Sequence, residues 1–207
     1  MLDPAVELAW FARGVRRLAG VDEAGRGPLA GPVVAAAVVV TPETPRLAGV
    51  TDSKQLPRRR REQLAAAIVS SLPYGVGAAS PREIDRLNIR RATALAMRRA
   101  ILRLPPGTDA ILIDGLAMAE LGMEHEALVG GDRRSYAIAC ASIVAKTVRD
   151  RLMRLLAARY PDAQLFFDLR GQPDSANPAT PREALEHVIR VFAPDAKLPD
   201  DEADVRN

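Results

Sequence analysis

A chain of 207 residues is long enough to bury a hydrophobic core as one domain, and 48% of its residues are hydrophobic although only 4% are aromatic. Its single cysteine excludes an internal disulfide framework and fits a reducing compartment. No apolar run reaches the roughly 18 residues that a membrane span needs, and the acidic N-terminal residues do not resemble a secretory signal, so we expect a cytoplasmic protein.

The charge of the chain is more informative in its type than in its sum. The formal net charge is only +3 at pH 7. Lys54, Lys146 and Lys197 are the only lysines among 29 basic residues, so arginine predominates. A basic body followed by the acidic stretch 200–204 suggests a polyanionic partner such as nucleic acid. An arginine bias of genomic origin explains the same composition equally well.

Hydrophobic periodicity and turn residues predict strands that alternate with helices. The expected elements are a helix over 5–13, strands over 17–23 and 33–40, a loop over 41–50, a helix over 57–71, a strand over 76–79, helices over 81–87 and 88–104, strands over 110–113 and 126–129, and helices over 135–159 and 179–191. The alternation indicates an α/β fold, and an antiparallel pairing of the first two strands would make the sheet mixed. No fixed-period repeat and no low-complexity linker marks a second large domain.

Two of the expected helices have an apolar face that predicts how they pack. The inward residues are Val6, Leu8, Ala9 and Trp10 in the first helix, and Ile89, Ala92, Leu95, Ala96 and Leu102 in the helix over 88–104. The arginine pairs of the second helix should then face outward.

Two adjacent acids, Asp22 and Glu23, end the first strand and lead into a turn that contains Gly25, Gly27 and Gly31. Successive side chains of a strand point to opposite faces, so the two carboxylates diverge unless the strand ends or bulges there. One acid can still offer its backbone carbonyl beside the carboxylate of the other, and a hard cation accepts both kinds of oxygen. A surface acidic pair before a hairpin turn is the alternative, but the glycines favour a backbone that a ligand approaches closely.

Asp114 and Asp132 resemble Asp22 in their position, because each stands at the C-terminal end of an apolar strand, before or within a glycine turn. Ligands of open α/β sheets gather at such strand ends. Together with Glu23 these acids would concentrate negative charge, which is unfavourable without a counter-cation. Two divalent metal ions about 3.5–4 Å apart would relieve the repulsion and form a clamp for phosphodiester hydrolysis. For Asp114 alone, a turn-capping role is the alternative.

Hydroxyl and ammonium groups at two further positions are candidate phosphate anchors. Ser53 and Lys54 precede a predicted helix, whose N-terminus favours a phosphate. Ser142, Lys146 and Asp150 are spaced four apart along one face of the long helix over 135–159. Each of these groups is equally compatible with a solvated surface when it is considered alone.

The stretch VDEAGRGPLAGPVVAAAV from residue 21 is similar to the opening motif of type 2 ribonucleases H, the ribonuclease HII family. Three further stretches follow in the order of the family: TDSKQL over 51–56, LIDG over 112–115, and GD over 131–132 with ASIVAK over 141–146. The resemblance implies a ribonuclease-H-like mixed sheet flanked by helices. It divides the chain into a catalytic domain over 1–162 and a short helical C-terminal appendage with an acidic tail over 163–207, both in one compact unit.

The resemblance also implies an activity and a site. The family cuts the RNA strand of RNA–DNA hybrids and nicks beside ribonucleotides embedded in duplex DNA, leaving 5′-phosphate and 3′-hydroxyl ends. By this resemblance two Mg²⁺ or Mn²⁺ ions are held by the catalytic residues Asp22, Glu23, Asp114 and Asp132. The ribose, with its 2′-hydroxyl, would be read by Gly25, Arg26 and Gly27, and phosphates would be held by Ser53, Lys54, Ser142 and Lys146. We expect a monomer whose partners are RNA–DNA hybrids and ribonucleotide-containing DNA duplexes.

One segment departs from the pattern of the family. The family usually has a Lys-Gly-Tyr element after the long helix, and its tyrosine stacks on the sugar at the junction between ribonucleotide and DNA. Here Arg170 and Gly171 are followed by Gln172, and no tyrosine lies beyond Tyr160. Aromatic stacking on a nucleotide is worth roughly 1–3 kcal/mol, so junction cleavage would be reduced. This departure favours one alternative, a hybrid-binding protein with reduced or lost junction cleavage. A separate alternative is a DNA-processing enzyme of the same acid-lined fold class, such as an integrase or resolvase, which would act on all-DNA substrates.

Overall fold

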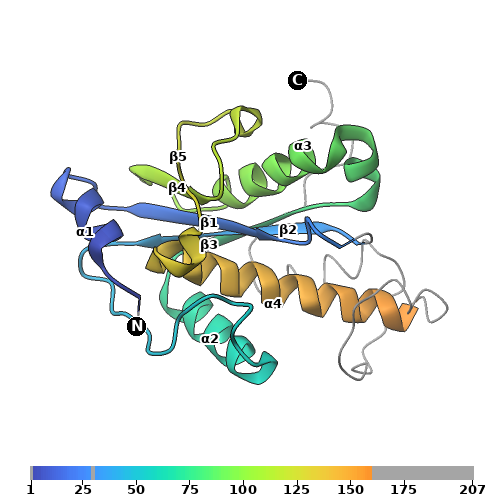
Figure 1. Cartoon of the computed structure of the whole chain (residues 1–207), viewed down its shortest axis with the longest axis horizontal. Helices are drawn as coiled ribbons and strands as arrows, with labels where there is room; N and C mark the ends of the chain where they lie inside the picture. The colour runs from blue at the N-terminus through green and yellow to red at the C-terminus, as the bar shows by residue number, and fades with distance from the viewer. Residues whose placement is uncertain (1, 29–30, 160–207) are drawn as a thin grey trace.

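The computed structural model describes residues 2–28 and 31–159 (Figure 1). Its elements are α1 (Ala5–Ala12), β1 (Leu18–Ala24), β2 (Val33–Val40), α2 (Arg58–Ser71), β3 (Tyr74–Ala79), α3 (Pro81–Ile101), β4 (Ala110–Asp114), the 3₁₀ turn η1 (Ala119–Leu121), β5 (Glu126–Leu128), the 3₁₀ turn η2 (Gly131–Arg133) and α4 (Tyr136–Arg159). The predicted helix over 179–191, the appendage over 163–207 and the segment around Gln172 lie outside the described residues.

The five strands form one mixed sheet in the order β3-β2-β1-β4-β5. β2 pairs antiparallel with both β1 and β3, as expected for the first two strands, while β4 lies parallel to both β1 and β5. Every residue of β2 is buried, which explains why its sequence is a continuous apolar run rather than an alternating one. The α/β class and the mixed sheet predicted from the sequence are confirmed.

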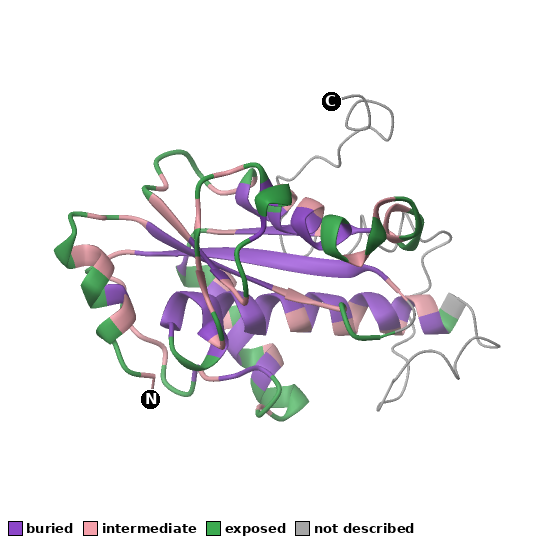
Figure 2. Cartoon of the chain, turned by 45° about the horizontal axis from the view of Figure 1, so that its top comes forward, coloured by how far each residue is buried: buried purple, intermediate pink, exposed green. Residues whose placement is uncertain are grey.

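Helices cover both faces of the sheet. α2 and α4 pack on one face and α3 packs on the other, as Figure 1 shows. Side chains of β1 alternate between the two layers, since Leu18 belongs to the core under α4 and Val21 to the core under α3. Figure 2 shows the resulting buried layer along the strands and the inner side of α4. Within the described ranges, no helix has the length and apolar character needed to cross a membrane.

The start of α4 lies directly against β1 because Gly20 has no side chain. A Cβ atom at Gly20 would lie 2.2 Å from the carbonyl carbon of Ala137, a distance that no side chain tolerates. Small residues on the helix, including the fully buried Ala137 and Ala141, complete the close contact. This approach brings the next turn of α4, with Ser142, to the strand ends that carry the acids.

α3 contains a break at Asn88, whose φ of 68° and ψ of 164° are not helical. The Asn88 side chain accepts hydrogen bonds from the backbone N–H groups of Arg90 and Arg91 and so caps the second part of the helix. The expected division into two helices near residue 88 is therefore confirmed. The inward position predicted for Leu102 is wrong, because the helix ends at Ile101 and Leu102 is 64% exposed.

The packing predicted for α1 is confirmed for Val6 and Trp10, which contact the core, and is wrong for Leu8 and Ala9, which are exposed. Leu8 is 58% exposed, whereas the acid Glu7 is only 2% exposed. The Glu7 carboxylate accepts hydrogen bonds from Arg46 at 2.8 Å and from the hydroxyl of Ser135 at 2.7 Å. It also accepts one from the backbone N–H of Ala137 at 3.4 Å, at the N-terminus of α4. A carboxylate is favourable at a helix N-terminus, and these partners compensate for its burial, so polarity overrides the apolar pattern here.

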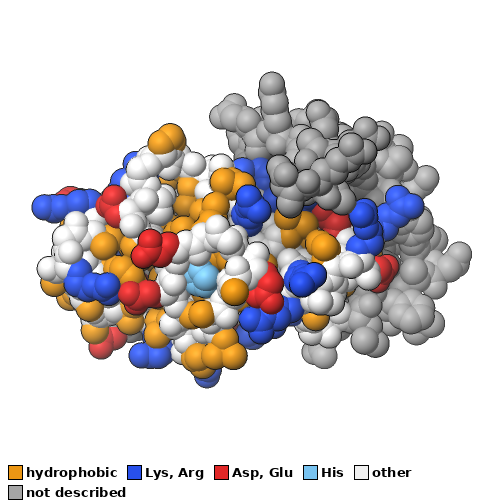
Figure 3. Space-filling view, turned by 90° about the horizontal axis from the view of Figure 1, so that it is seen from above, with side chains coloured by type: hydrophobic (Ala, Val, Ile, Leu, Met, Phe, Trp, Pro, Cys, Tyr) orange, Lys and Arg blue, Asp and Glu red, His pale blue; other side chains and the backbone are white. Residues whose placement is uncertain are grey.

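Several arginines are engaged within the protein rather than displayed to a partner. Arg99 pairs with Glu83 and Arg90 pairs with Glu120, each at 2.8 Å. The face seen from above in Figure 3 accordingly carries small groups of acidic and basic side chains among hydrophobic ones. An excess of arginine in the sequence therefore does not translate into a continuous basic surface on this face.

We predict that Glu7→Ala lowers the free energy of unfolding by about 3 kcal/mol, because it leaves the guanidinium of Arg46 and the hydroxyl of Ser135 without their buried partner. Urea denaturation followed by circular dichroism measures the change. Leu8→Ala on the same helix is the matched control and should shift stability by no more than about 0.5 kcal/mol. Equal effects of the two substitutions would contradict the assignment of Glu7 as the anchor of α4.

Candidate active site

Two acids meet because adjacent parallel strands carry them at the same level. In the register of β1 and β4, Gly20 pairs with Leu112 and Val21 pairs with Ile113, so Asp22 and Asp114 come next on each strand. Both acids alternate onto the face that α4 covers, together with Leu112. Asp132 arrives from η2, which follows β5. Asp22, Asp114 and Asp132 each place one carboxylate oxygen within 4.8 Å of the others.

Backbone hydrogen bonds fix the positions of these acids. The N–H of Gly131 donates to Asp114 Oδ1 at 2.6 Å, which joins the end of β4 to the turn that carries Asp132. The N–H of Glu23 donates to Asp22 Oδ1 at 2.7 Å. Asp22 and Asp114 are thus each oriented by a backbone group, whereas the carboxylate of Asp132 faces the side chains of Lys54 and Arg133.

Glu23 stands beside the three aspartates but not among them. It follows Asp22 on the strand and therefore alternates toward the opposite face. Its Oε1 accepts a hydrogen bond from Arg26 at 3.1 Å. Its Oε2 is buried and has no hydrogen-bond partner among the described residues. A buried carboxylate oxygen without a partner is unfavourable, and a cation bound within reach of this oxygen would satisfy it.

The acids oppose one another's ionisation. Burial raises the pKa of Asp22 well above its usual value, and the negative charges of Glu23 and Asp114 raise it further, against a hydrogen bond from the Ser142 hydroxyl. Burial and the charge of Asp114 likewise raise the pKa of Asp132, while Lys54 opposes the rise. For Glu23, burial raises the pKa and Arg26 partly offsets it. Carboxyl groups with these shifts accept their negative charge readily only when a cation is bound.

The candidate phosphate anchors fall into two kinds. The hydroxyls of Ser53 and Ser142 are buried and hydrogen-bonded to each other at 2.9 Å, so they connect the loop before α2 to α4. Lys54 projects into solvent with its side chain 79% exposed, and its ammonium lies 3.8 Å from Asp132 Oδ2. Lys146 donates to Asp150 Oδ1 at 2.6 Å and is one third exposed.

The glycines of the loop after β1 have different requirements. Gly25 has a φ of 109°, and a Cβ atom there would lie 2.3 Å from Nε of Arg149. The fold itself therefore demands glycine at position 25. Gly27 has no positive φ, and a Cβ atom there would meet nothing within 4 Å. Its exposed backbone is open to a ligand from outside, next to the half-exposed Arg26.

Three residues of the site were not among those that the sequence singled out. Arg133 lies 3.8 Å from Asp132 Oδ1, and the side chain of Asp52 accepts the N–H of Lys54 at 2.9 Å. Both are sequence neighbours of residues that were singled out, and that adjacency was the available signal. Arg149 is buried and donates to the carbonyl of Pro32 at 3.2 Å, beneath the glycine loop. Nothing in its sequence context distinguishes it from a surface arginine.

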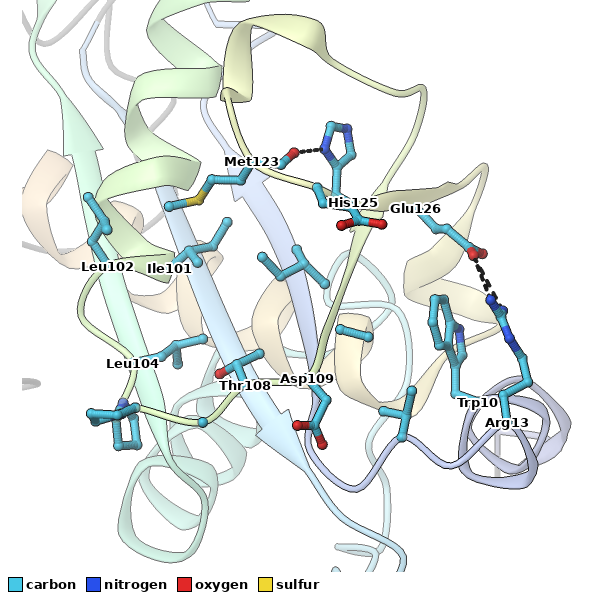
Figure 4. A pocket seen from close by; sticks show the side chains of 17 residues that line it. Trp10, Arg13, Ile101, Leu102, Leu104, Thr108, Asp109, Met123, His125 and Glu126 are labelled. Atoms are coloured by element: carbon cyan, nitrogen blue, oxygen red, sulfur yellow. Dashed lines mark hydrogen bonds and ion pairs between the residues drawn. The ribbon is translucent and has the colours of Figure 1, made fainter.

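A cavity of about 630 Å³ lies at the other end of β4, where Asp109 and Ala110 precede and begin the strand that Asp114 ends (Figure 4). Trp10, Leu104 and Met123 line it together with residues of the turn after α3. None of the acids described above contributes to it. The cavity is thus separate from the acidic site.

The fold is shared with solved nucleases. The crystal structure of the ribonuclease H2 from Pyrococcus horikoshii OT3 matches with a TM-score of 0.63 and 30% identity, covering 85% of this chain and 88% of that one. The crystal structure of Bst-RNase HIII in complex with Mn²⁺ matches with a TM-score of 0.61 and 26% identity, covering 85% of this chain and 62% of that one. The chain is accordingly a metal-dependent ribonuclease with a ribonuclease-H-like fold.

The comparison of sequences is more specific. The family model of ribonuclease HII matches residues 19–165. The ribonuclease HII of Syntrophotalea carbinolica is 52% identical over 151 residues, which cover 72% of this chain and 72% of that relative. The chain belongs to the ribonuclease HII family. Membership implies an endonuclease that acts on the RNA of RNA–DNA hybrids.

We predict that Asp22→Asn raises the melting temperature of the metal-free protein at pH 7–8 by a few degrees, since a chain of this size gains about 2–4 °C for each kcal/mol. Folding raises the pKa of Asp22, so the protonated carboxyl group is the form that the folded state favours. Its contribution to stability is present at low pH and is lost as pH rises above about 4. The advantage of the variant should therefore disappear below about pH 4. Thermal denaturation in EDTA across this pH range measures it.

Asp109→Asn is the control of opposite sign. The Asp109 carboxylate accepts the N–H groups of Arg16 and Arg17, which lower its pKa, so the charged form stabilises the fold above its usual pKa. This substitution should lower the melting temperature at pH 7–8. A lower melting temperature for Asp22→Asn as well would show that repulsion does not dominate at the acid cluster.

Proposed function

We propose that the chain nicks duplex DNA at embedded ribonucleotides in addition to cutting the RNA strand of hybrids, and that Asp22, Glu23, Asp114 and Asp132 hold two Mg²⁺ or Mn²⁺ ions for this reaction. The observation that carries the proposal is the group of three carboxylate oxygens within 4.8 Å of one another, reached from three separate segments of the chain. All four acids come from one chain, so we take the monomer as the functional unit.

The donor set fits hard divalent cations. Every group offered is an oxygen, and Mg²⁺ and Mn²⁺ prefer carboxylate ligands to nitrogen or sulfur. The buried Oε2 of Glu23 supplies a further oxygen that no described residue satisfies. When bound, the ions would supply an activated water and neutralise charge on the leaving oxygen. The raised pKa values of Asp22, Glu23 and Asp132 support a bound cation, because these carboxylates ionise readily only beside a positive charge.

The protein's own groups would orient the acids and the substrate backbone. The N–H of Glu23 holds Asp22 and the N–H of Gly131 holds Asp114, so both carboxylates are oriented before a substrate arrives. Lys54, Arg133 and Arg26 stand exposed at the rim and would contact phosphates on either side of the cut. Such contacts set the register of the strand without reading its sequence.

Recognition of the ribose is assigned to the backbone of Gly25, Arg26 and Gly27. A 2′-hydroxyl both donates and accepts a hydrogen bond, and exposed backbone groups match it where no side chain intervenes. The free space around Gly27 is consistent with this approach from outside. The alternative is a hybrid-binding protein in which cleavage at the ribonucleotide–DNA junction is reduced or lost. The complete set of acids favours the enzyme, whereas Gln172 in place of the tyrosine of the family favours the alternative.

Asp132→Asn should abolish cleavage with the fold intact. The substitution removes one negative oxygen from the acid cluster, and we expect the rate to fall by at least about 100-fold, because loss of an outer partner of a metal ligand already costs 10- to 100-fold. Gel analysis of a duplex with a single ribonucleotide in one strand, with Mg²⁺ present, measures the rate. Asp85→Asn, at an exposed position of α3, is the control that should cut at the wild-type rate. An all-DNA duplex should remain intact, which separates this reading from an integrase or resolvase.

Gly27→Ala should impair cleavage without affecting stability. The added methyl group meets no atom of the described residues but occupies the surface that the ribose would approach, so we expect the ratio kcat/KM to fall by about 10-fold or more at an unchanged melting temperature. Gly25→Ala should instead lower the melting temperature, since it combines a positive φ with a clash against Arg149. Wild-type cleavage by Gly27→Ala would remove this glycine from the ribose-reading surface.

A further inference from the structure

We propose that Arg61 is a positioning residue of this nuclease, which holds residues 53–56 against α4 and thereby keeps Ser53 and Lys54 at the acidic site. The inference rests on the proposed function, because it concerns the same reaction. It assigns a role to a residue that touches neither the acids nor the exposed rim.

Arg61 differs from the arginines beside it. Residues 58–60 are exposed, whereas Arg61 is only 8% exposed. It shares the inner face of α2 with Leu64, Ala65 and Ile68. A guanidinium on an apolar helix face is unfavourable unless several acceptors surround it, so its partners there are informative.

The guanidinium of Arg61 bridges the two ends of one loop and a helix. Its Nη1 donates to the carbonyl of Leu56 at 3.1 Å and to that of Ser53 at 3.4 Å. Its Nη2 donates to Asp150 Oδ2 on α4 at 2.7 Å. The other oxygen of Asp150 accepts the ammonium of Lys146, so the carboxylate is held from two sides. A single rigid side chain therefore fixes the loop over 53–56 relative to α4.

This loop reaches the acidic site at two points. The Ser53 hydroxyl is bonded to that of Ser142, whose hydroxyl lowers the pKa of Asp22. The ammonium of Lys54 lies 3.8 Å from Asp132. The hydrogen bonds from Lys54 and Gln55 to the Asp52 side chain stay within the segment and do not anchor it to the body of the protein. A shift of the loop would thus move two groups that face the acids.

A general bracing of α2 on α4 does not explain the contacts of Arg61. Glu62 already joins the two helices, since its Oε1 accepts a hydrogen bond from Arg154 at 3.1 Å. Only the Arg61 bridge also binds the loop carbonyls. A lysine has no planar fork and would be able to pair with Asp150 but not span the three acceptors. The two bridges therefore form a matched pair for experiment.

The experiment compares Arg61→Met, Arg61→Lys and Glu62→Gln in the full chain with wild type. With Mg²⁺ and a duplex that contains one ribonucleotide, kcat of Arg61→Met should fall roughly 10- to 100-fold with a smaller change in KM, because the groups at the acids are misplaced rather than removed. Arg61→Lys should recover part of this loss. Glu62→Gln should cut within about 2-fold of wild type, as expected for a partly exposed ion pair.

Two further readouts separate positioning from stability. Amide hydrogen exchange of residues 53–56 in the unliganded protein should be faster in Arg61→Met and unchanged in Glu62→Gln. In a Ser53→Ala background, Arg61→Met should lower kcat by a much smaller factor than it does in the wild type, because both substitutions act on Ser53. Additive losses, unchanged exchange of the loop, or an equal loss in Glu62→Gln would each overturn the inference. Absence of cleavage by the wild type would instead refute the proposed function, while the exchange measurement would still decide the role of Arg61.

Discussion

The mutual repulsion of the carboxylates at the ends of β1 and β4 is the constraint on which the rest of the structure depends. Three oxygens within 4.8 Å of one another, on side chains that are largely withdrawn from water, are unfavourable in the absence of a cation. The fold sustains this arrangement because the residues around the acids have no freedom to move them apart. The parallel register of β1 and β4 sets the level of two acids, and the N–H of Gly131 ties the third segment to Asp114. The stability lost at the site is thus a property of its function rather than a defect of packing.

α4 holds the acidic site together, because it contacts each of the segments that surround the acids. Its start is seated on β1 at Gly20 and anchored by the buried carboxylate of Glu7. Further along, Ser142 contacts Asp22, Arg149 supports the glycine loop, and Asp150 receives Arg61 from α2. Because one continuous helix carries all of these contacts, the glycine loop after β1 and the loop with Lys54 are both held by the same rigid element. The relative placement of the acids and the two loops is therefore set by helix geometry, which is less variable than that of loops.

The sequence predicted the parts of the fold and site that depend on local pattern. The apolar runs, the glycine turns and the positions of Asp22, Asp114 and Asp132 at strand ends gave the mixed sheet and the convergence of these three acids. Alternation along β1 already separated Asp22 from Glu23, and the structure places Glu23 beside the group rather than within it. The errors occurred where a tertiary partner reversed a local preference. Glu7 is buried because the start of α4 supplies its hydrogen-bond donors. The error at Leu102 has another cause, since α3 ends at Ile101 and Leu102 no longer lies on its inner face. No local pattern reports a partner that is more than 100 residues away.

Arginine and lysine perform different tasks in this chain, and that division bears on why arginine predominates. Arg61 and Arg149 are buried and Arg46 is partly buried. Arg46 and Arg61 each donate to a carboxylate and to at least one backbone carbonyl, a set that a single ammonium would not span, and Arg149 donates to the carbonyl of Pro32. Of the two lysines among the described residues, Lys54 lies 3.8 Å from Asp132 and Lys146 pairs with Asp150, and both remain partly or largely exposed. A compact, mobile ammonium suits a phosphate that arrives and leaves with each turnover, whereas a planar fork suits a loop that must stay in place. A genomic bias toward arginine would fill surface positions without regard to geometry. The buried arginines are therefore explained by their contacts, and the bias accounts at most for the exposed ones.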